Sequence, residues 1–174
     1  MCIRDSYEPA DARALCAAGF SPITAALLCS RGYRDAGAAR EFLSCSYPLS
    51  SPFALLDMDK AAARVKQALS RREHIAVFGD YDVDGITATC LLTEYLRSKG
   101  GHVTSYIPAR LEEGYGLNPI AIDTLKKQGV ELIVTVDCGI TANHEAALCR
   151  ELGIDLVITD HHECKSELPQ AIAL

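Results

Sequence analysis

The sequence IAVFGDYDVDG, residues 75–85, decides the fold that we expect for this chain. Its first five residues form a short, continuous apolar run with β-branched members, which is typical of a buried strand. Three carboxylates, Asp80, Asp82 and Asp84, follow at alternate positions. Carboxylates held this close raise one another's pKa values or recruit a cation. The segment therefore predicts a metal site at the end of a strand.

The same carboxylates have the spacing of an EF-hand calcium loop, D-x-D-x-D-G, which is the obvious alternative. Counted from Asp80, the twelfth position, which should hold a bidentate glutamate, is Leu91. An EF-hand loop also needs a helix before it, whereas residues 75–79 have the pattern of a strand. We therefore reject the EF-hand.

Length and composition limit the class of protein. The 174 residues suit one large domain, or one domain with an appendage. We expect no membrane segment, because no apolar run approaches the roughly 20 residues of a span, and no signal peptide opens the chain. Eight cysteines without a C-x-x-C pair indicate neither a zinc ribbon nor a disulfide framework, which favours the cytoplasm. The net charge of −6 gives no overall support for nucleic-acid binding, although a local basic groove is compatible with it. Residues 1–6 carry no readable signal and need not be native.

Residues 1–72 predict a small helical lead-in. Ser21 as N-cap, Pro22 at the first helical position and Gly32 beyond the end define one helix. The apolar face of this helix would consist of Ile23, Leu27 and Leu28.

Three further segments complete the lead-in. A second helical pattern spans residues 36–43, and the serines and prolines of residues 46–52 predict an irregular connection. Asp57 or Asp59 then caps a last helix. The apolar positions of that helix are Ala62, Val65, Ala68 and Leu69.

From residue 73 onward the pattern changes to an alternation of strands and helices. Apolar runs at 75–79, 103–107, 132–136 and 154–158 are separated by stretches of helical period, each long enough for a crossover helix. Residues 73–174 therefore predict an α/β fold, a parallel sheet with crossover helices. Ala88, Leu91, Leu92, Tyr95 and Leu96 would form the apolar face of the first crossover helix, Asn118 and Pro119 would start the second, and Thr141 or Asn143 would cap the third.

Charged or imidazole side chains follow every predicted strand. The first strand precedes the three aspartates named above, and the others precede Arg110, Asp137 and the segment Asp160-His161-His162. The carboxyl ends of parallel strands share one edge, where ligands bind in open α/β sheets. A helix cap or a histidine bonded to backbone explains any one of these residues equally well. Their repetition at four strand ends favours one common site.

The donor types indicate which ion this site would bind. Carboxylates with imidazole and without cysteine suit Mn²⁺ or Mg²⁺, and the histidines favour Mn²⁺. The number of donors is enough for two ions about 3.5–4 Å apart, an arrangement that hydrolyses phosphate esters.

Three segments, GDYDVDG at 79–85, VDCG at 136–139 and TDHH at 159–162, resemble the first three motifs of the DHH phosphoesterase superfamily. The intervening PARLEEGYGLN at 108–118, with the helical lead-in, resembles the RecJ single-strand-specific exonucleases. The resemblance implies a two-metal enzyme that degrades single-stranded DNA from the 5′ end in recombination and repair. It also implies a fourth-motif aspartate and a second domain beyond this stretch, so that the present chain alone would bind metal weakly and cleave poorly.

The same resemblance implies roles for individual residues. It makes Asp82, Asp84, Asp137 and His161 metal ligands, with Asp137 bridging, and it places His162 against the scissile phosphate. Asp160 and Asp80 would support or complete the ligand shell. Some relatives have a metal-binding histidine four residues before Asp82, where this sequence has Phe78. Asp80 or water would take its place.

Two residues between the second strand and the second crossover helix are candidates for substrate contacts. Arg110 would pair with a substrate phosphate through its guanidinium fork, or else form a salt bridge with Glu112 or Glu113. Tyr115 would stack on a base, or else pack within its turn.

Two other functions remain open at this point. One is a DHH phosphodiesterase that acts on short oligonucleotides or cyclic dinucleotides. The other is a non-catalytic nucleic-acid-binding relative, against which the intact Asp82, Asp84, Asp137 and His161 argue.

Overall fold

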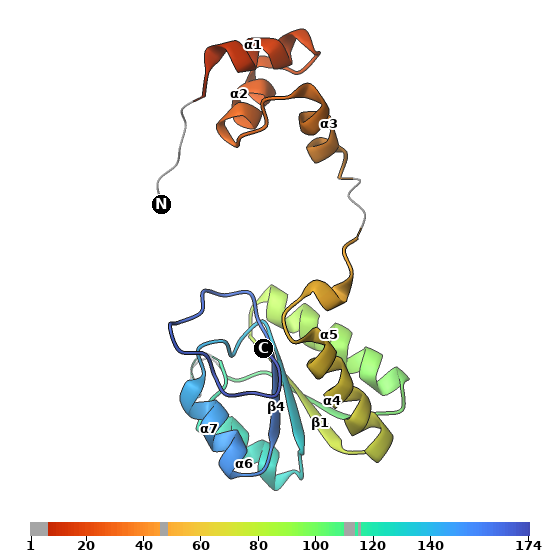
Figure 1. Cartoon of the computed structure of the whole chain (residues 1–174). Coiled ribbons are helices and arrows are strands. Elements are labelled where there is room, and N and C mark those ends of the chain that lie inside the picture. Colours follow the sequence, from red (N-terminus) through yellow and green to blue (C-terminus); the bar gives the residue numbers. More distant parts are fainter. Residues whose placement is uncertain (1–6, 46–48, 110–113, 115) are drawn as a thin grey trace. The chain divides into compact units, whose positions relative to one another are not determined.

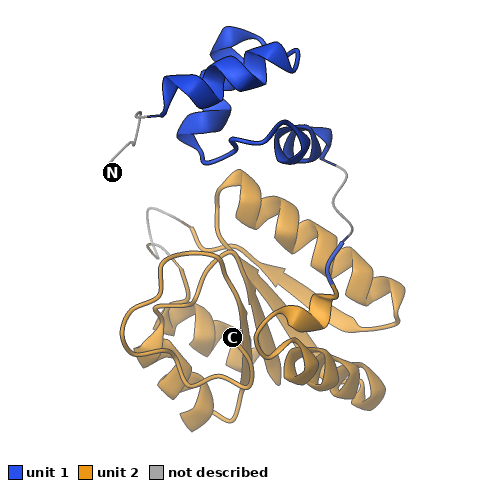
Figure 2. Ribbon diagram, turned by 45° about the horizontal axis from the view of Figure 1, so that its top comes forward, with its two compact units in different colours: residues 1–50 blue, residues 51–174 orange. Residues whose placement is uncertain are grey.

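The computed structural model describes residues 7–45, 49–109, 114 and 116–174 (Figure 1). The chain forms two compact units, residues 1–50 and residues 51–174 (Figure 2). The predicted division lay at residue 72. The difference arises because the helix before the first strand packs with the sheet, as shown below.

Over residues 7–45 the first unit contains three short helices, α1 (Pro9–Ala17), α2 (Pro22–Ser30) and α3 (Ala36–Ser44). The predicted start of α2 is confirmed, since the Ser21 hydroxyl accepts a hydrogen bond from the Thr24 N–H (3.1 Å). The predicted apolar face was correct for Leu28 and wrong for Ile23 and Leu27, which are exposed. Leu15, Ala25, Leu28, Cys29 and Ala39 form the small core of this unit.

The second unit is an α/β fold with one parallel sheet, as predicted. Its strands are β1 (His74–Gly79), β2 (His102–Tyr106), β3 (Leu132–Val136) and β4 (Asp155–Thr159), in the order β2-β1-β3-β4. A short 3₁₀ turn, η1 (Pro52–Ala54), precedes the helices α4 (Met58–Arg71), α5 (Val83–Ser98), α6 (Pro119–Lys127) and α7 (Asn143–Glu151). Residues 172–173 continue the sheet beside β4, since the Ile158 N–H donates to the Ala173 carbonyl (3.0 Å).

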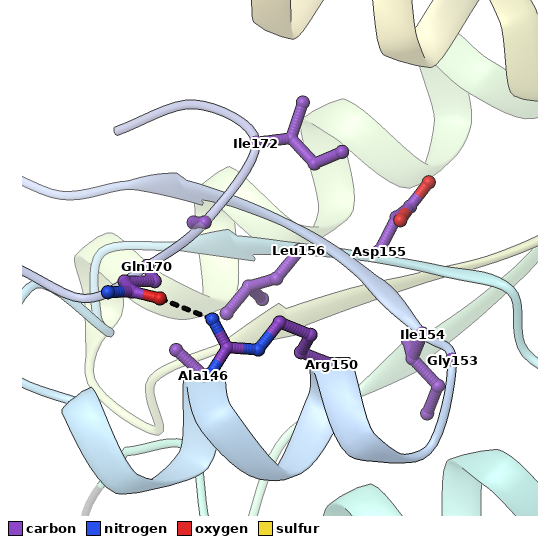
Figure 3. Close-up of a pocket in the computed structure, with 9 residues that line it drawn as sticks. Ala146, Arg150, Gly153, Ile154, Asp155, Leu156, Gln170 and Ile172 are labelled. Carbon is purple, nitrogen blue, oxygen red and sulfur yellow. Dashed lines mark hydrogen bonds between the residues drawn. The ribbon is translucent and has the colours of Figure 1, made fainter.

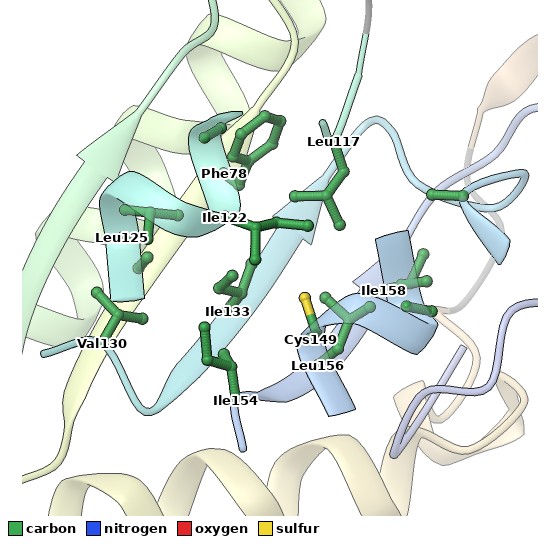
Figure 4. Close-up of a cluster of buried hydrophobic side chains, with 14 of the residues drawn as sticks. Phe78, Leu117, Ile122, Leu125, Val130, Ile133, Cys149, Ile154, Leu156 and Ile158 are labelled. Carbon is green, nitrogen blue, oxygen red and sulfur yellow. The ribbon is translucent and has the colours of Figure 1, made fainter. Parts of the chain in front are cut away.

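Helices cover both faces of this sheet, because successive strand residues point to opposite sides. Ile75, Val77 and Val134 face α4 and α5. Ala76, Phe78 and Ile133 face α6 and α7, in the cluster drawn in Figure 4. The strands β1 and β3 and the middle of β4 are buried on both sides, which explains their continuous apolar runs, whereas the edge strand β2 is partly exposed.

The helix α4 is joined to the sheet by packing and by charge. Ala68 is fully buried in the cluster that contains Ile75 and Val77. The buried Arg64 donates from Nη2 to Glu73 and from Nε to Asp155, each at 2.5 Å. These contacts place α4 in the second unit rather than in the helical lead-in.

Several predicted helix ends proved different in detail. Asn118 caps α6 as predicted, its side chain accepting from the Ala121 N–H (2.9 Å). The predicted cap of α7 was wrong, because the helix starts after Ala142 without a side-chain cap. Neither predicted aspartate caps α4 through its side chain; Asp57, the residue before the helix, pairs instead with Lys60 (2.7 Å).

The buried face of α5 also differs from the prediction. Leu96 is buried, but Leu91 is 76% exposed and Tyr95 is exposed as well. The helix instead turns the small residues Gly85, Thr89 and Thr93 inward. Within the described ranges, no helix has both the length and the apolar character that crossing a bilayer requires.

Candidate metal centre

The register of the sheet brings three aspartates to one level. Gly79 of β1 pairs with Val136 of β3, and Val136 pairs with Thr159 of β4. The residues that follow these three are Asp80, Asp137 and Asp160. The predicted edge of carboxylates is therefore built directly by the strand pairing.

The loop after β1 holds two carboxylates through its own backbone. The buried Asp80 accepts from the Tyr81 N–H (2.7 Å), and Asp82 caps α5 by accepting from the Gly85 N–H (3.0 Å). A Cβ atom on Gly85 would lie only 2.4 Å from the Asp80 carbonyl oxygen. The glycine is needed here because α5 begins directly against the end of the strand.

Asp137, the residue after β3, is the central carboxylate. Its backbone has a φ of 60°, and its N–H donates to the Thr159 carbonyl (2.9 Å). The side chain is only 7% exposed, and its Oδ1 lies 2.9 Å from His161 Nε2. Burial, and then the charge of Asp82, raise the pKa of Asp137, while His161 and His162 oppose this shift.

The Oδ1 atom of Asp137 has an unusual environment. Although the His161 ring is close, Oδ1 is buried and accepts no well-aligned hydrogen bond within the described part of the chain. A buried carboxylate oxygen is normally satisfied by donors or by a cation. This atom therefore fits a cation better than it fits the metal-free protein.

Asp160, the residue after β4, differs from Asp137 because both of its oxygens are used. Oδ1 accepts from the backbone N–H groups of His161 (2.7 Å) and His162 (3.0 Å), and Oδ2 accepts from the Ile140 N–H (2.9 Å). Burial alone would raise the pKa of Asp160, but these bonds and the His162 ring lower it overall.

The two histidines lie side by side, with ring centroids 4.7 Å apart. His162 Nδ1 is 2.7 Å from Asp160 Oδ1, and this hydrogen bond raises the pKa of His162. His161 Nε2 faces Asp137 as described above.

Within the part of the chain that the structure describes, potential ligand atoms gather in two groups, and the atoms of each group lie within 4.8 Å of one another. One group is Asp80, Asp82 and Asp137, and the other is Asp137, His161 and His162. Asp137 belongs to both. Oxygen donors dominate the first group and imidazoles the second, a donor set that suits Mn²⁺ or Mg²⁺.

Besides Asp160, three predicted site residues stand outside these groups. Asp84 belongs to neither. It lies in the first turn of α5, two residues after the cap Asp82, and its role as a ligand remains a prediction. Arg110 and Tyr115 lie outside the described residues, so their roles remain predictions.

Two neighbours of the site are core residues rather than ligands. Phe78 is fully buried and stacks on Tyr106, with ring centroids 5.4 Å apart. Burial raises the pKa of the Cys138 thiol to about 12. Asp80 is thus better placed than position 78 to supply a ligand.

The bonding of Asp160 to Ile140 was missed at the sequence level, because no pattern in the sequence indicates that contact.

A separate pocket of about 410 Å³ lies between α7, the start of β4 and residues 170–172 (Figure 3). Two of its lining residues are joined by a hydrogen bond, which Arg150 donates to the side-chain oxygen of Gln170. Among the described residues, its lining contains no member of the two groups. The candidate metal centre is therefore an open edge of the sheet and not this pocket.

Carboxylates follow β1 and β3, and an Asp-His-His segment follows β4. This order of residues along a parallel sheet is characteristic of one class of protein. Residues 74–174 match the DHH family, N-terminal domain, and the chain belongs to this family.

Individual relatives narrow the comparison to single-stranded-DNA-specific exonucleases named RecJ. The Bacillus subtilis protein is 45% identical over 155 residues, which are 88% of this chain and 20% of the relative. The Escherichia coli protein is 36% identical over 154 residues, which are 88% of this chain and 26% of the relative. The chain thus spans about a fifth to a quarter of the length of these relatives.

Solved structures agree with this comparison. A crystal structure of exonuclease RecJ bound to manganese matches with a TM-score of 0.66 and 38% identity, over 72% of this chain and 32% of that one. RecJ from Thermus thermophilus in complex with Mn²⁺ matches with a TM-score of 0.68 and 31% identity, over 96% of this chain and 23% of that one. The α/β fold is therefore shared with metal-bound nucleases.

Proposed function

We propose that this chain carries most of the metal site of a divalent-metal-dependent exonuclease that hydrolyses single-stranded DNA. The single observation that carries the proposal is the Asp137 carboxylate, which two groups of potential ligands share. The names of the RecJ relatives, and the manganese in two of the solved structures, support it. The 5′-to-3′ direction and the role in recombination and repair rest on the RecJ resemblance.

The proposal gives each clustered residue a role, and the role of His162 rests on the RecJ resemblance. Bound Mn²⁺ or Mg²⁺ would supply an activated water and positive charge at the phosphoryl oxygens. Asp80 and Asp82 present carboxylates from the β1 loop, while His161 presents an imidazole from the β4 end. Asp137 stands between them. His162 binds the scissile phosphate with its ring held by Asp160.

Other parts of the proposal remain predictions from the sequence. They include Asp84 as a ligand, Arg110 at a substrate phosphate, Tyr115 on a base and a cytoplasmic location. The partners are single-stranded DNA and a second domain of the longer protein, which would complete the site.

Replacement of Asp137 tests the proposed function. In the full-length protein that carries this sequence, Asp137→Asn removes the shared charge, and we expect Mn²⁺-dependent release of nucleotides from a 5′-phosphorylated single strand to fall at least 100-fold, which corresponds to about 2.7 kcal/mol. Asp123→Asn, on the exposed surface of α6, is the matched control. Retained activity in Asp137→Asn would rule out the mechanism.

A comparison of substrates tests the specificity. A long single strand and a dinucleotide are offered to the wild-type protein at equal concentration of ends. We expect the long strand to be degraded faster. A preference for the dinucleotide would instead favour a phosphodiesterase of short oligonucleotides.

A further inference from the structure

Both oxygens of the Asp160 carboxylate are already bonded by the protein itself. Oδ1 accepts from the backbone N–H groups of His161 and His162 and contacts the His162 ring at Nδ1, and Oδ2 accepts from the Ile140 N–H. The side chain is only 2% exposed. A metal ion at Oδ1 would have to displace bonds that already compensate this buried charge.

Asp137 and Asp160 follow neighbouring strands at the same level, yet their environments are opposite. Asp137 has a buried oxygen without an aligned donor, and it belongs to both groups of potential ligands. Asp160 has its donors and belongs to neither group. The two carboxylates therefore have different tasks.

The four bonds of Asp160 connect parts that carry the site. Its Oδ2 fixes the loop that follows Asp137, through Ile140. Its Oδ1 fixes both the backbone turn and the ring of His162. One side chain thus ties the end of β3 to the histidines after β4.

We propose that Asp160 is a positioning residue and not a metal ligand: it holds the His162 imidazole in the tautomer with hydrogen on Nδ1. Nε2 is then the nitrogen that Asp160 does not engage, and it is the one presented to substrate. A carboxylate that holds one ring nitrogen sets the tautomer and the ring orientation. The contact of His162 with substrate rests on the proposed function, whereas the tautomer does not.

The tautomer is measured in the metal-free 174-residue chain by ¹⁵N NMR of the histidine rings, at a pH where His162 is neutral. His162→Gln identifies the signals. We expect the Nδ1–H tautomer to dominate in the wild type and in Asp123→Asn. Asp160→Ala should lose this preference, and Asp160→Asn, which keeps one acceptor oxygen, should restore part of it. If Asp160→Ala fails to fold, the wild-type spectrum and Asp160→Asn decide. A dominant Nε2–H tautomer in the wild type, or an unchanged tautomer in a folded Asp160→Ala, would overturn the proposal.

Mn²⁺ alone, titrated calorimetrically into the same chain, separates positioning from ligation. Loss of an outer partner typically lowers metal affinity by about 10–100-fold. We compare the fold loss of Mn²⁺ affinity in two variants. We expect the loss in Asp160→Asn to be at least ten times smaller than the loss in Asp137→Asn. An equal loss would identify Asp160 as a ligand.

A double-mutant cycle in the full-length protein connects the tautomer to turnover. Asp160→Asn alone should lower kcat. In the His162→Gln background the same substitution should lower kcat by no more than about a further twofold, because positioning has no effect once the ring is gone. Additive losses would overturn action through His162. An inactive wild type would count against the proposed function only, since the NMR result is independent of activity.

Discussion

Gly85 shows how tightly one residue controls this site. Its Cα lies against the Asp80 backbone, so an added methyl group would be 2.4 Å from the carbonyl oxygen, 2.6 Å from the carbonyl carbon and 2.6 Å from the nitrogen. Backbone atoms cannot swing aside as a flexible side chain does. The position of Asp80 thus depends on the absence of a side chain five residues later.

We predict that Gly85→Ala destabilises the second unit by about 1–3 kcal/mol, as overpacking typically does. It should also weaken Mn²⁺ binding, because Asp80 must move. Urea unfolding and calorimetry measure the two effects. Gly37→Ala is the control, since its added methyl group meets only the end of the Asp35 side chain. Wild-type stability in Gly85→Ala would show that the loop relaxes freely.

His74 provides a second prediction at the residue scale. Its ring is buried, lies 2.7 Å from Thr104 Oγ1 and stacks on His102. Burial lowers the pKa of His74 and the His102 ring lowers it further, while the Gln128 carbonyl and Glu131 oppose the shift. The folded protein therefore disfavours the protonated ring.

The lowered pKa of His74 fixes the direction in which the stability changes with pH. Below about pH 6.5 the unfolded chain takes up a proton that folded His74 resists, so the free energy of unfolding should fall as pH falls from there toward the lowered pKa. His74→Gln should flatten this slope in urea unfolding series between pH 5 and 7.5. His144→Gln, on the exposed surface of α7, should leave it unchanged. A steeper slope in His74→Gln would contradict the assignment.

At the scale of elements, α4 depends on an ion-pair network. Arg64 reaches Glu73 before β1 and Asp155 at the start of β4, and both Arg64 and Glu73 are buried. Removal of one partner from a buried pair leaves an uncompensated charge, which is more damaging than loss of the pair itself. The network thus joins a helix and two strands that are distant in sequence.

We predict that Arg64→Ala lowers the free energy of unfolding by about 3–5 kcal/mol. The double variant Arg64→Ala with Glu73→Gln should recover part of this loss, because the stranded charge is gone. Urea unfolding of the three proteins measures the difference. Equal stability of the single and double variants would show that Glu73 is not the stranded charge.

At the scale of the whole molecule, the acidic edge of the sheet links metal binding to folding. The chain carries a net charge of −6, and the buried side chains of Asp80, Asp137 and Asp160 lie at the carboxyl ends of the strands. A cation that binds only the folded state stabilises it by mass action. Stability and metal occupancy should therefore rise together.

We predict that Mn²⁺ at 100 times its Kd raises the free energy of unfolding by about 2.7 kcal/mol. Chelation with EDTA should reverse the change. Asp137→Asn should show little increase at the same concentration, whereas Asp123→Asn should behave as wild type. Thermal unfolding with and without Mn²⁺ measures this. Stabilisation of Asp137→Asn equal to wild type would place the ion elsewhere.

The sequence predicts the succession of strands and helices well, because buried parallel strands require continuous apolar runs. It predicts less well which face of a helix is buried. In α5, Leu91 and Tyr95 are exposed, whereas Thr89 packs so closely on β1 that Gly79 has no room for a side chain. Such contacts depend on distances between elements, which a one-dimensional pattern does not contain.

The left-handed backbone of Asp137 restricts which amino acids can replace it over evolution. Aspartate, asparagine and glycine adopt this conformation far more readily than β-branched residues do. A descendant that abandons catalysis while keeping its shape should therefore carry asparagine or glycine at this corner, and valine or isoleucine should be rare there. The residues found at this position in related sequences that have lost catalysis would reveal this preference without any activity assay.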